Sequence, residues 1–73
     1  MVAVISRGGY AIAIEKVSGV YRIVKAHKKF TRAKETLRKF MASEPDTNWV
    51  MVKELDGCVF KIWYPLEMSS EED

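Results

Sequence analysis

The sequence has little of what builds covalent cross-links or metal sites. Its 73 residues include one cysteine, Cys58, and one histidine, His27. A single cysteine excludes an intramolecular disulfide, and these two residues cannot supply the ligand set of a structural zinc site. We therefore expect no metal and no cofactor. The sparse use of cysteine favours a reducing, cytosol-like compartment.

Long hydrophobic runs are also missing. No stretch approaches the roughly 18 consecutive apolar residues that a membrane-spanning helix requires. Residues 1–5 are apolar, but the run is too short for a secretory signal and carries no positive side chain at its start. The sequence thus predicts a soluble, cytoplasmic chain without a membrane partner.

Charge is distributed unevenly along the chain. The net charge is +2, yet residues 1–66 contain all twelve lysine and arginine residues and only six acids, which gives this part +6. The four remaining acids follow at the C-terminus. We expect one basic domain over residues 1–66 and a disordered acidic tail over residues 67–73, since the tail has little to bury.

Two pairs of extended segments are separated by turn signals. Residues 10–17 and 20–26 flank Ser18-Gly19, and residues 49–55 and 58–64 flank Asp56-Gly57, a preferred two-residue hairpin turn. The first turn predicts that Glu15 faces Arg22 and that Ile14 faces Ile23. Residues 2–5 also look extended, either as an extra edge strand or as the start of a long first strand.

One helix is expected between the hairpins. Thr31 is a candidate N-cap, the helix should run for about 12 residues, and Pro45 must end it. The apolar stripe consists of Ala33, Leu37, Phe40 and Met41. The fold class is therefore α+β: a ββαββ order, with a four-stranded antiparallel sheet and one helix packed on one face.

Both faces of the predicted sheet are apolar, although one helix covers only one. In the second hairpin the expected core face carries Trp49, Met51, Leu55, Cys58, Phe60, Ile62 and Tyr64. We expect the opposite face to remain open and to form a homodimer through Val24, Val50, Val52, Val59 and Trp63. The alternative is that β-branched residues simply suit strands and tolerate exposure.

Several turn and core positions resemble a known group of small domains. They are Gly9-Tyr10, Phe30-Thr31 opening a helix with Ala33 and Leu37, residues 50–52, and Asp56-Gly57. This pattern is similar to the small ββαββ domains of unknown function found in bacteria and their phages, and it implies the fold without any site. The short chain with an acidic tail also resembles the accessory proteins with which phages inhibit host machinery.

The reactive side chains do not form a catalytic pattern. His27 lies in a run of positive charge that lowers its pKa, and Cys58 is expected to be a buried, inert thiol. A nucleophile needs a base and an orienting group, which this spacing does not predict. We therefore expect a binding protein and not an enzyme.

The basic segment is the strongest electrostatic signal. Between Arg22 and Lys39 there are eight lysine or arginine residues and one acid, Glu35. The candidate partner-binding residues are Lys25, Lys28, Lys29, Arg32 and Arg38. An acidic protein surface is the favoured partner, and the phosphate backbone of a nucleic acid is the alternative.

Overall fold

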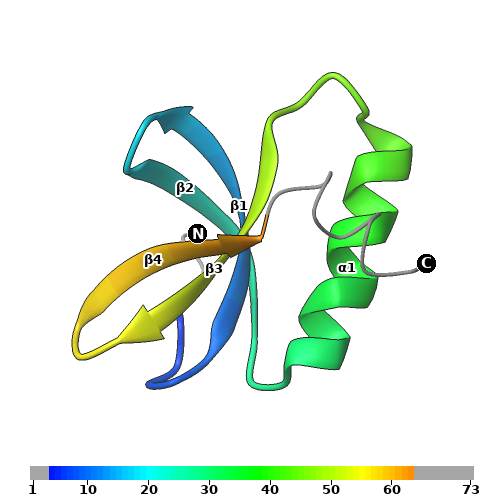
Figure 1. The fold of residues 1–73 in the computed structure, drawn as a ribbon. Coiled ribbons are helices and arrows are strands. Elements are labelled where there is room, and N and C mark those ends of the chain that lie inside the picture. The colour runs from blue at the N-terminus through cyan, green and yellow to red at the C-terminus, as the bar shows by residue number, and fades with distance from the viewer. Residues whose placement is uncertain (1–3, 64–73) are drawn as a thin grey trace.

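The computed structural model describes residues 4–63, and these residues form one sheet and one helix. The elements are β1 (Tyr10–Val17), β2 (Val20–His27), α1 (Phe30–Ser43), β3 (Trp49–Leu55) and β4 (Cys58–Trp63). All strand pairs are antiparallel, the order across the sheet is β2-β1-β3-β4, and α1 covers one face (Figure 1). The α+β class and the ββαββ order are confirmed.

The turns account for the two hairpins. Asp56 and Gly57 both have positive φ, 51° and 82°, which is the backbone that a type I′ turn requires. Gly19 has a φ of 81° in the first turn. The predicted register of the first hairpin is wrong by one residue, because Glu15 pairs with Tyr21 and a register shift lies between Glu15 and Val17.

The helix begins slightly earlier than expected. Its N-cap is Lys29, which makes no side-chain capping bond, so the prediction of Thr31 as N-cap is wrong. The Phe30 ring packs between Tyr10 and Trp63, with centroids 5.5 Å from each, and this contact fixes the first turn. The backbone N–H of Glu44 donates to the Phe40 carbonyl at 2.8 Å, and Pro45 then prevents continuation.

The core between helix and sheet is built largely as expected. Its buried members are Ile12, Ala33, Leu37, Trp49 and Met51. Phe40 packs on Trp49 with ring centroids 4.9 Å apart, and the Trp49 indole N–H donates to the Glu44 carbonyl at 3.0 Å. The helix stripe and the alternation along β3 are thus confirmed. Together they hold α1 against the two central strands.

A β-bulge changes the faces of the second hairpin. Met51 pairs with Trp63 and Val52 pairs with Lys61, so Ile62 of β4 has no pairing partner on β3. Trp63 therefore lies with the helix-side core instead of on the far face. Three residues of the expected core face, Leu55, Cys58 and Phe60, are exposed because β4 begins beyond the reach of α1.

The far face of the sheet is a second small core and not an open surface. Val50 and Val52 are fully buried there with Ala11 and Ala13. The residues that cover them are Ile5, Tyr21, Ile23 and Ala26. The small alanines and the register shifts let the sheet curl over this face, which we call the concave face.

An ion pair spans the concave face. Lys61 on β4 donates to both carboxylate oxygens of Glu15 on β1 at 3.2 Å, across the intervening strand β3. Both side chains are largely shielded from solvent. The pair therefore connects an outer strand to a central one where the sheet is curled.

The segment before β1 is held by backbone contacts. Gly9 is buried, and a Cβ there would lie 2.9 Å from the Ser6 carbonyl oxygen and 3.0 Å from that of His27, so only glycine fits. The Glu54 carboxylate accepts the N–H groups of Gly8 and Gly57, each at 2.6 Å. Residues 4 and 5 belong to no strand, so this part of the segment 2–5 forms neither an extra edge strand nor the start of β1.

Some predictions fall beyond the described part of the chain. Tyr64, the start of the segment 2–5 and the predicted disordered tail 67–73 lie outside residues 4–63. Within the described residues, no helix is both long and apolar enough to cross a membrane.

Candidate basic interface and the adjoining pocket

The end of β2 brings two polar side chains toward the helix. Lys25 pairs with Ile12 and His27 with Tyr10, and both partners belong to the helix-side core. Residues that pair across strands share a face of the sheet. Lys25 and His27 therefore lie on the side of β2 that faces α1.

His27 joins the strand to the helix. Its Nε2 lies 2.7 Å from Thr36 Oγ1 in α1, within a hydrogen bond. Burial lowers the pKa of His27 below the usual 6.5, and the positive charges of Lys25 and Arg32 lower it further. The charges of a strand residue and a helix residue thus act on the same imidazole ring.

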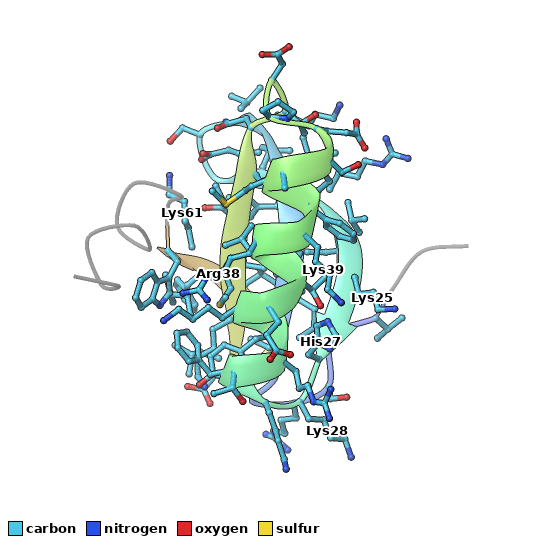
Figure 2. All side chains as sticks on the ribbon, turned by 90° about the vertical axis from the view of Figure 1, so that its right-hand side faces the viewer. Lys25, His27, Lys28, Arg38, Lys39 and Lys61 are labelled. Carbon is cyan, nitrogen blue, oxygen red and sulfur yellow. The ribbon has the colours of Figure 1, made fainter. Side chains whose placement is uncertain are left out.

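The helix places its cations on two different flanks. Residues three or four apart share a flank, so Arg32, Thr36 and Lys39 face the β2 side. Figure 2 shows Lys39 beside Lys25 and His27 on that flank, and Arg38 on the other flank of the helix. The structure thus places Arg38 apart from the other four predicted cations.

Four of the five predicted partner-binding residues, all except Arg38, lie in one region of the structure, and Lys39 belongs to the same region. We define the basic cluster as Lys25, Arg32 and Lys39 near His27, together with Lys28 and Lys29 in the connection from β2 to α1. All five are exposed, and among residues 4–63 no acid forms an ion pair with any of them. Sequence reasoning missed Lys39, although its spacing of three from Thr36 and seven from Arg32 was a sufficient signal.

The start of α1 adds to the positive potential of the cluster. Lys28 and Lys29 lie in the connection from β2, and the first helical turn contains no acid. Helix N-termini carry a partial positive charge, so cations there are mutually unfavourable. An anionic partner relieves this repulsion.

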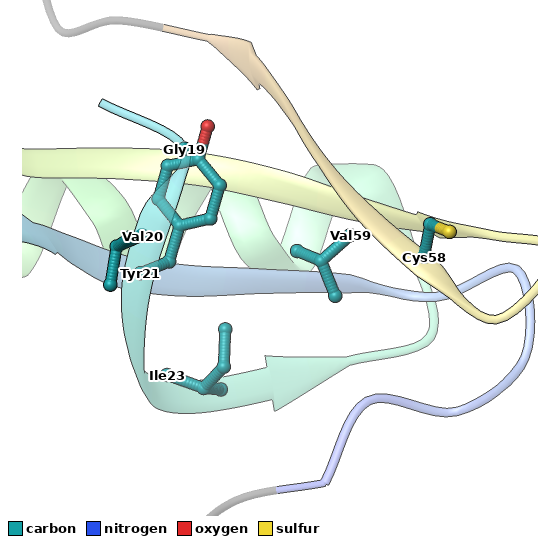
Figure 3. Close-up of a pocket in the computed structure, with 6 residues that line it drawn as sticks. All are labelled: Gly19, Val20, Tyr21, Ile23, Cys58 and Val59. Carbon is teal, nitrogen blue, oxygen red and sulfur yellow. The ribbon is translucent and has the colours of Figure 1, made fainter. Parts of the chain in front are cut away.

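A pocket opens on the concave face on the other side of β2. Its volume is about 470 Å³, and Figure 3 shows the six residues that line it: Gly19, Val20, Tyr21, Ile23, Cys58 and Val59. They come from β2, β4 and the turn before β2, although β2 and β4 are the two outer strands of the sheet. Curling of the sheet brings these strands to a common pocket. Val20 remains 54% exposed and Val59 38% exposed at its rim.

The residues expected to mediate self-association lie in three different places. Val50 and Val52 are buried within the chain, and Trp63 packs on the helix side beneath Lys34, whose Nζ lies 5.7 Å from the ring centroid. The expectation that these three are exposed on an open face is wrong. Val24, at the bulge of β2, and Val59 are partly exposed.

The reactive residues do not meet. His27 contacts the helix, whereas Cys58 is an exposed free thiol that lines the concave pocket. The expectation that Cys58 is buried is wrong, because its strand starts outside the core. Within residues 4–63, no group of three or more His, Cys, Asp or Glu residues is placed to hold a metal ion.

Comparisons with protein-family models, curated proteins and solved structures found no match to this chain. The resemblance to small ββαββ domains therefore remains a likeness of fold order. Function has to be argued from the basic cluster and the pocket.

Proposed function

We propose that this chain is a small, non-catalytic protein-interaction module that binds an acidic protein surface through the basic cluster. The observation that carries the proposal is that Lys25, Arg32 and Lys39 lie on the flank of the His27–Thr36 contact, with Lys28 and Lys29 in the adjoining connection to α1. None of the five forms an ion pair with an acid among the described residues. Complementary charge steers association and selects partners. Such a module would act by occupying a partner's surface, which is also how a phage-type inhibitor of a larger complex would act.

The placement of the aromatic residues favours a protein over a nucleic acid. Proteins that bind single strands stack bases on exposed aromatic rings beside a basic groove. Here Tyr10 packs against Phe30 and lies under Lys53, whose Nζ is 4.1 Å from the ring centroid, while Trp63 packs against Phe30 and Lys34. Tyr21 lies on the concave face. The described residues thus provide no stacking platform beside the basic cluster.

The experiment compares acidic probes of equal length. Fluorescent poly-L-glutamate of about 20 residues, a single-stranded DNA and a duplex of similar length would be titrated with the full chain over a range of salt concentrations. We expect poly-glutamate to bind more tightly than either nucleic acid near 0.15 M salt, about the physiological ionic strength. Tighter binding of DNA, with the steep salt dependence of phosphate contacts, would favour the nucleic-acid alternative.

Charge-reversal variants locate the site. Lys25→Glu and Arg32→Glu should each weaken poly-glutamate binding about tenfold or more, in line with the loss of a favourable charge pair and the gain of a repulsive one. Lys34→Glu makes the same change in net charge on the opposite flank of α1 and is the matched control. Equal losses in all three variants would mean that net charge, and not the basic cluster, governs binding.

We also propose that the chain self-associates, but through a different set of exposed apolar residues from the set that the sequence predicts. Apart from Val4, Val24 and the pocket-rim residues Val20 and Val59, the exposed large apolar side chains of the described residues lie near the hairpin turns, at Val17, Leu55 and Phe60. Both hairpins project away from α1 (Figure 1), so a contact between two copies at these turns leaves the basic cluster accessible. A two-fold axis would bury the same residues twice.

A further inference from the structure

β2 is an outer strand whose two faces have different chemistry. It pairs with β1 alone among the described strands, so the backbone groups on its other edge lack a strand partner. Its helix-side face presents Lys25 and His27, and its concave face presents Tyr21 and Ile23. An incoming strand would therefore meet positive charge on one face and an apolar pocket on the other.

We propose that the outer edge of β2, which pairs with no other strand among the described residues, binds an extended partner segment in which acidic and apolar residues alternate. Extended peptides add to exposed sheet edges through main-chain hydrogen bonds, and pockets for alternate side chains give specificity. Side chains of neighbouring strands that pair with each other share a face. The acidic residues of the segment thus lie beside Lys25 and Lys39, while an apolar residue enters the pocket lined by Val20 and Ile23. This inference rests on the proposed function and names the partner's chemistry.

The charges of β2 itself argue against a second copy as the occupant. Pairing β2 with another β2 would bring Arg22 and Lys25 of each copy onto a shared interface, and like charges opposite one another are destabilising. Edge lysines and bulges are the devices by which proteins prevent indiscriminate strand pairing, and β2 has both, with its bulge at Val24. An acidic residue on an incoming strand would instead be attracted to Lys25.

The pocket has room for an apolar side chain, and its lining is mostly apolar. Its volume of about 470 Å³ is in the range of sites that hold a whole small molecule, so one side chain occupies only part of it. Tyr21 and Cys58 supply the polar atoms. Because Val20 and Val59 are partly exposed, an apolar side chain seated there removes surface from water on both partners.

The test uses three synthetic peptides of about nine residues, titrated against the full chain. The first alternates Glu and Val, the second has the same composition in blocks, and the third is the alternating peptide N-methylated at every second amide. We expect the alternating peptide to bind at least about tenfold more tightly than the block peptide, and N-methylation to abolish the advantage by removing main-chain donors. Equal affinities for all three would overturn the inference.

Hydrogen exchange identifies the strand that pairs. Binding of the alternating peptide should slow amide exchange in β2, because amides that become hydrogen-bonded are protected. Slowing at β4 instead, or at neither outer strand, would contradict the placement. If the peptides bind alike while poly-glutamate still binds at the basic cluster, this inference fails and the proposed function stands. If poly-glutamate also fails to bind, the proposed function fails.

Substitutions separate the pocket from the cluster. Val20→Ser at the rim should weaken binding of the alternating peptide about fivefold or more and leave poly-glutamate binding unchanged. Val17→Ser is the matched control, because Val17 is 66% exposed and does not line the pocket. An equal effect of both substitutions on the alternating peptide would exclude the pocket as the seat of an apolar side chain.

Discussion

His27 is kept neutral near physiological pH by its surroundings. Burial, followed by the charges of Lys25 and Arg32, holds the pKa of His27 below 6.5. The folded chain therefore binds fewer protons here than the unfolded chain does. The stability linked to this residue is present above pH 6.5 and is lost as the pH falls from 6.5 through the folded pKa.

Neutralising either neighbour should shift this titration. We expect Lys25→Gln and Arg32→Gln each to raise the pKa of His27 toward 6.5, with burial still holding it below that value. The His27 C2 proton, followed by NMR against pH, provides the measurement. Lys34→Gln, on the opposite flank of α1, is the control and should leave the titration curve of His27 unchanged. An unchanged His27 titration in both test variants would mean that the cations lie too far away to act on the ring.

Glu54 gives a second pH-dependent contribution to stability. Hydrogen bonds from the backbone N–H groups of Gly8 and Gly57 lower its pKa below 4.5. Its stabilising effect is therefore present above pH 4.5 and is lost as the pH falls through the folded pKa. Urea unfolding of Glu54→Gln should show a weaker pH dependence below pH 4.5 than the parent chain. A pH dependence below pH 4.5 equal to that of the parent chain would contradict this contribution.

At the scale of strands, two valines on the concave face should respond very differently to a charge. Val52 is fully buried between Ala11 and Lys61, whereas Val59 is 38% exposed at the pocket rim. A carboxylate in a buried site costs several kcal/mol, and the neighbouring Lys61 is already bonded to Glu15, so Val52→Asp should cost at least about 3 kcal/mol in the free energy of unfolding. Val59→Asp should cost about 1 kcal/mol or less. Urea denaturation measures both, and comparable losses would contradict the second core.

The order and bounds of the elements were largely predictable because local chemistry determines them. Asp56-Gly57 adopts the positive φ angles that its residue types favour, and Pro45 ends the helix region. Ala33 and Leu37 are the buried helix positions, as their spacing indicates. These signals act over a few residues, so one sequence is enough to read them.

The faces beyond each register shift were not predictable in the same way. The bulge that moves Trp63 to the helix side depends on how β4 fits against β3 and α1, and no residue pair in the sequence marks it. Curling of the sheet over Val50 is likewise a property of four strands together. At the candidate site, the prediction grouped Arg38 with Lys25 because both belong to the same basic segment of the sequence. Helical spacing, which places residues three or four apart on one flank, puts Arg38 and Lys39 on different flanks.

At the scale of the whole molecule, the predicted homodimer can be tested at the exposed apolar residues near the hairpin turns. We expect light scattering to give twice the chain mass at both low and high salt, because an apolar contact resists screening. Val17→Asp and Phe60→Asp should shift the mass toward that of one chain, since both residues are exposed near the hairpin turns and neither lines the pocket. Circular dichroism would verify that the variants remain folded. A single-chain mass for the parent would exclude the dimer.

The strand order also has a consequence for the folding rate. β1 and β3 pair at the centre of the sheet, yet they belong to different hairpins with α1 between them in the chain. Each hairpin has a tight turn and can form within microseconds, whereas joining β1 to β3 requires closure of a long loop. Docking of the two preformed hairpins is therefore expected to limit the rate, and Ala11, Ala13 and Val50 lie at the seam where that step occurs.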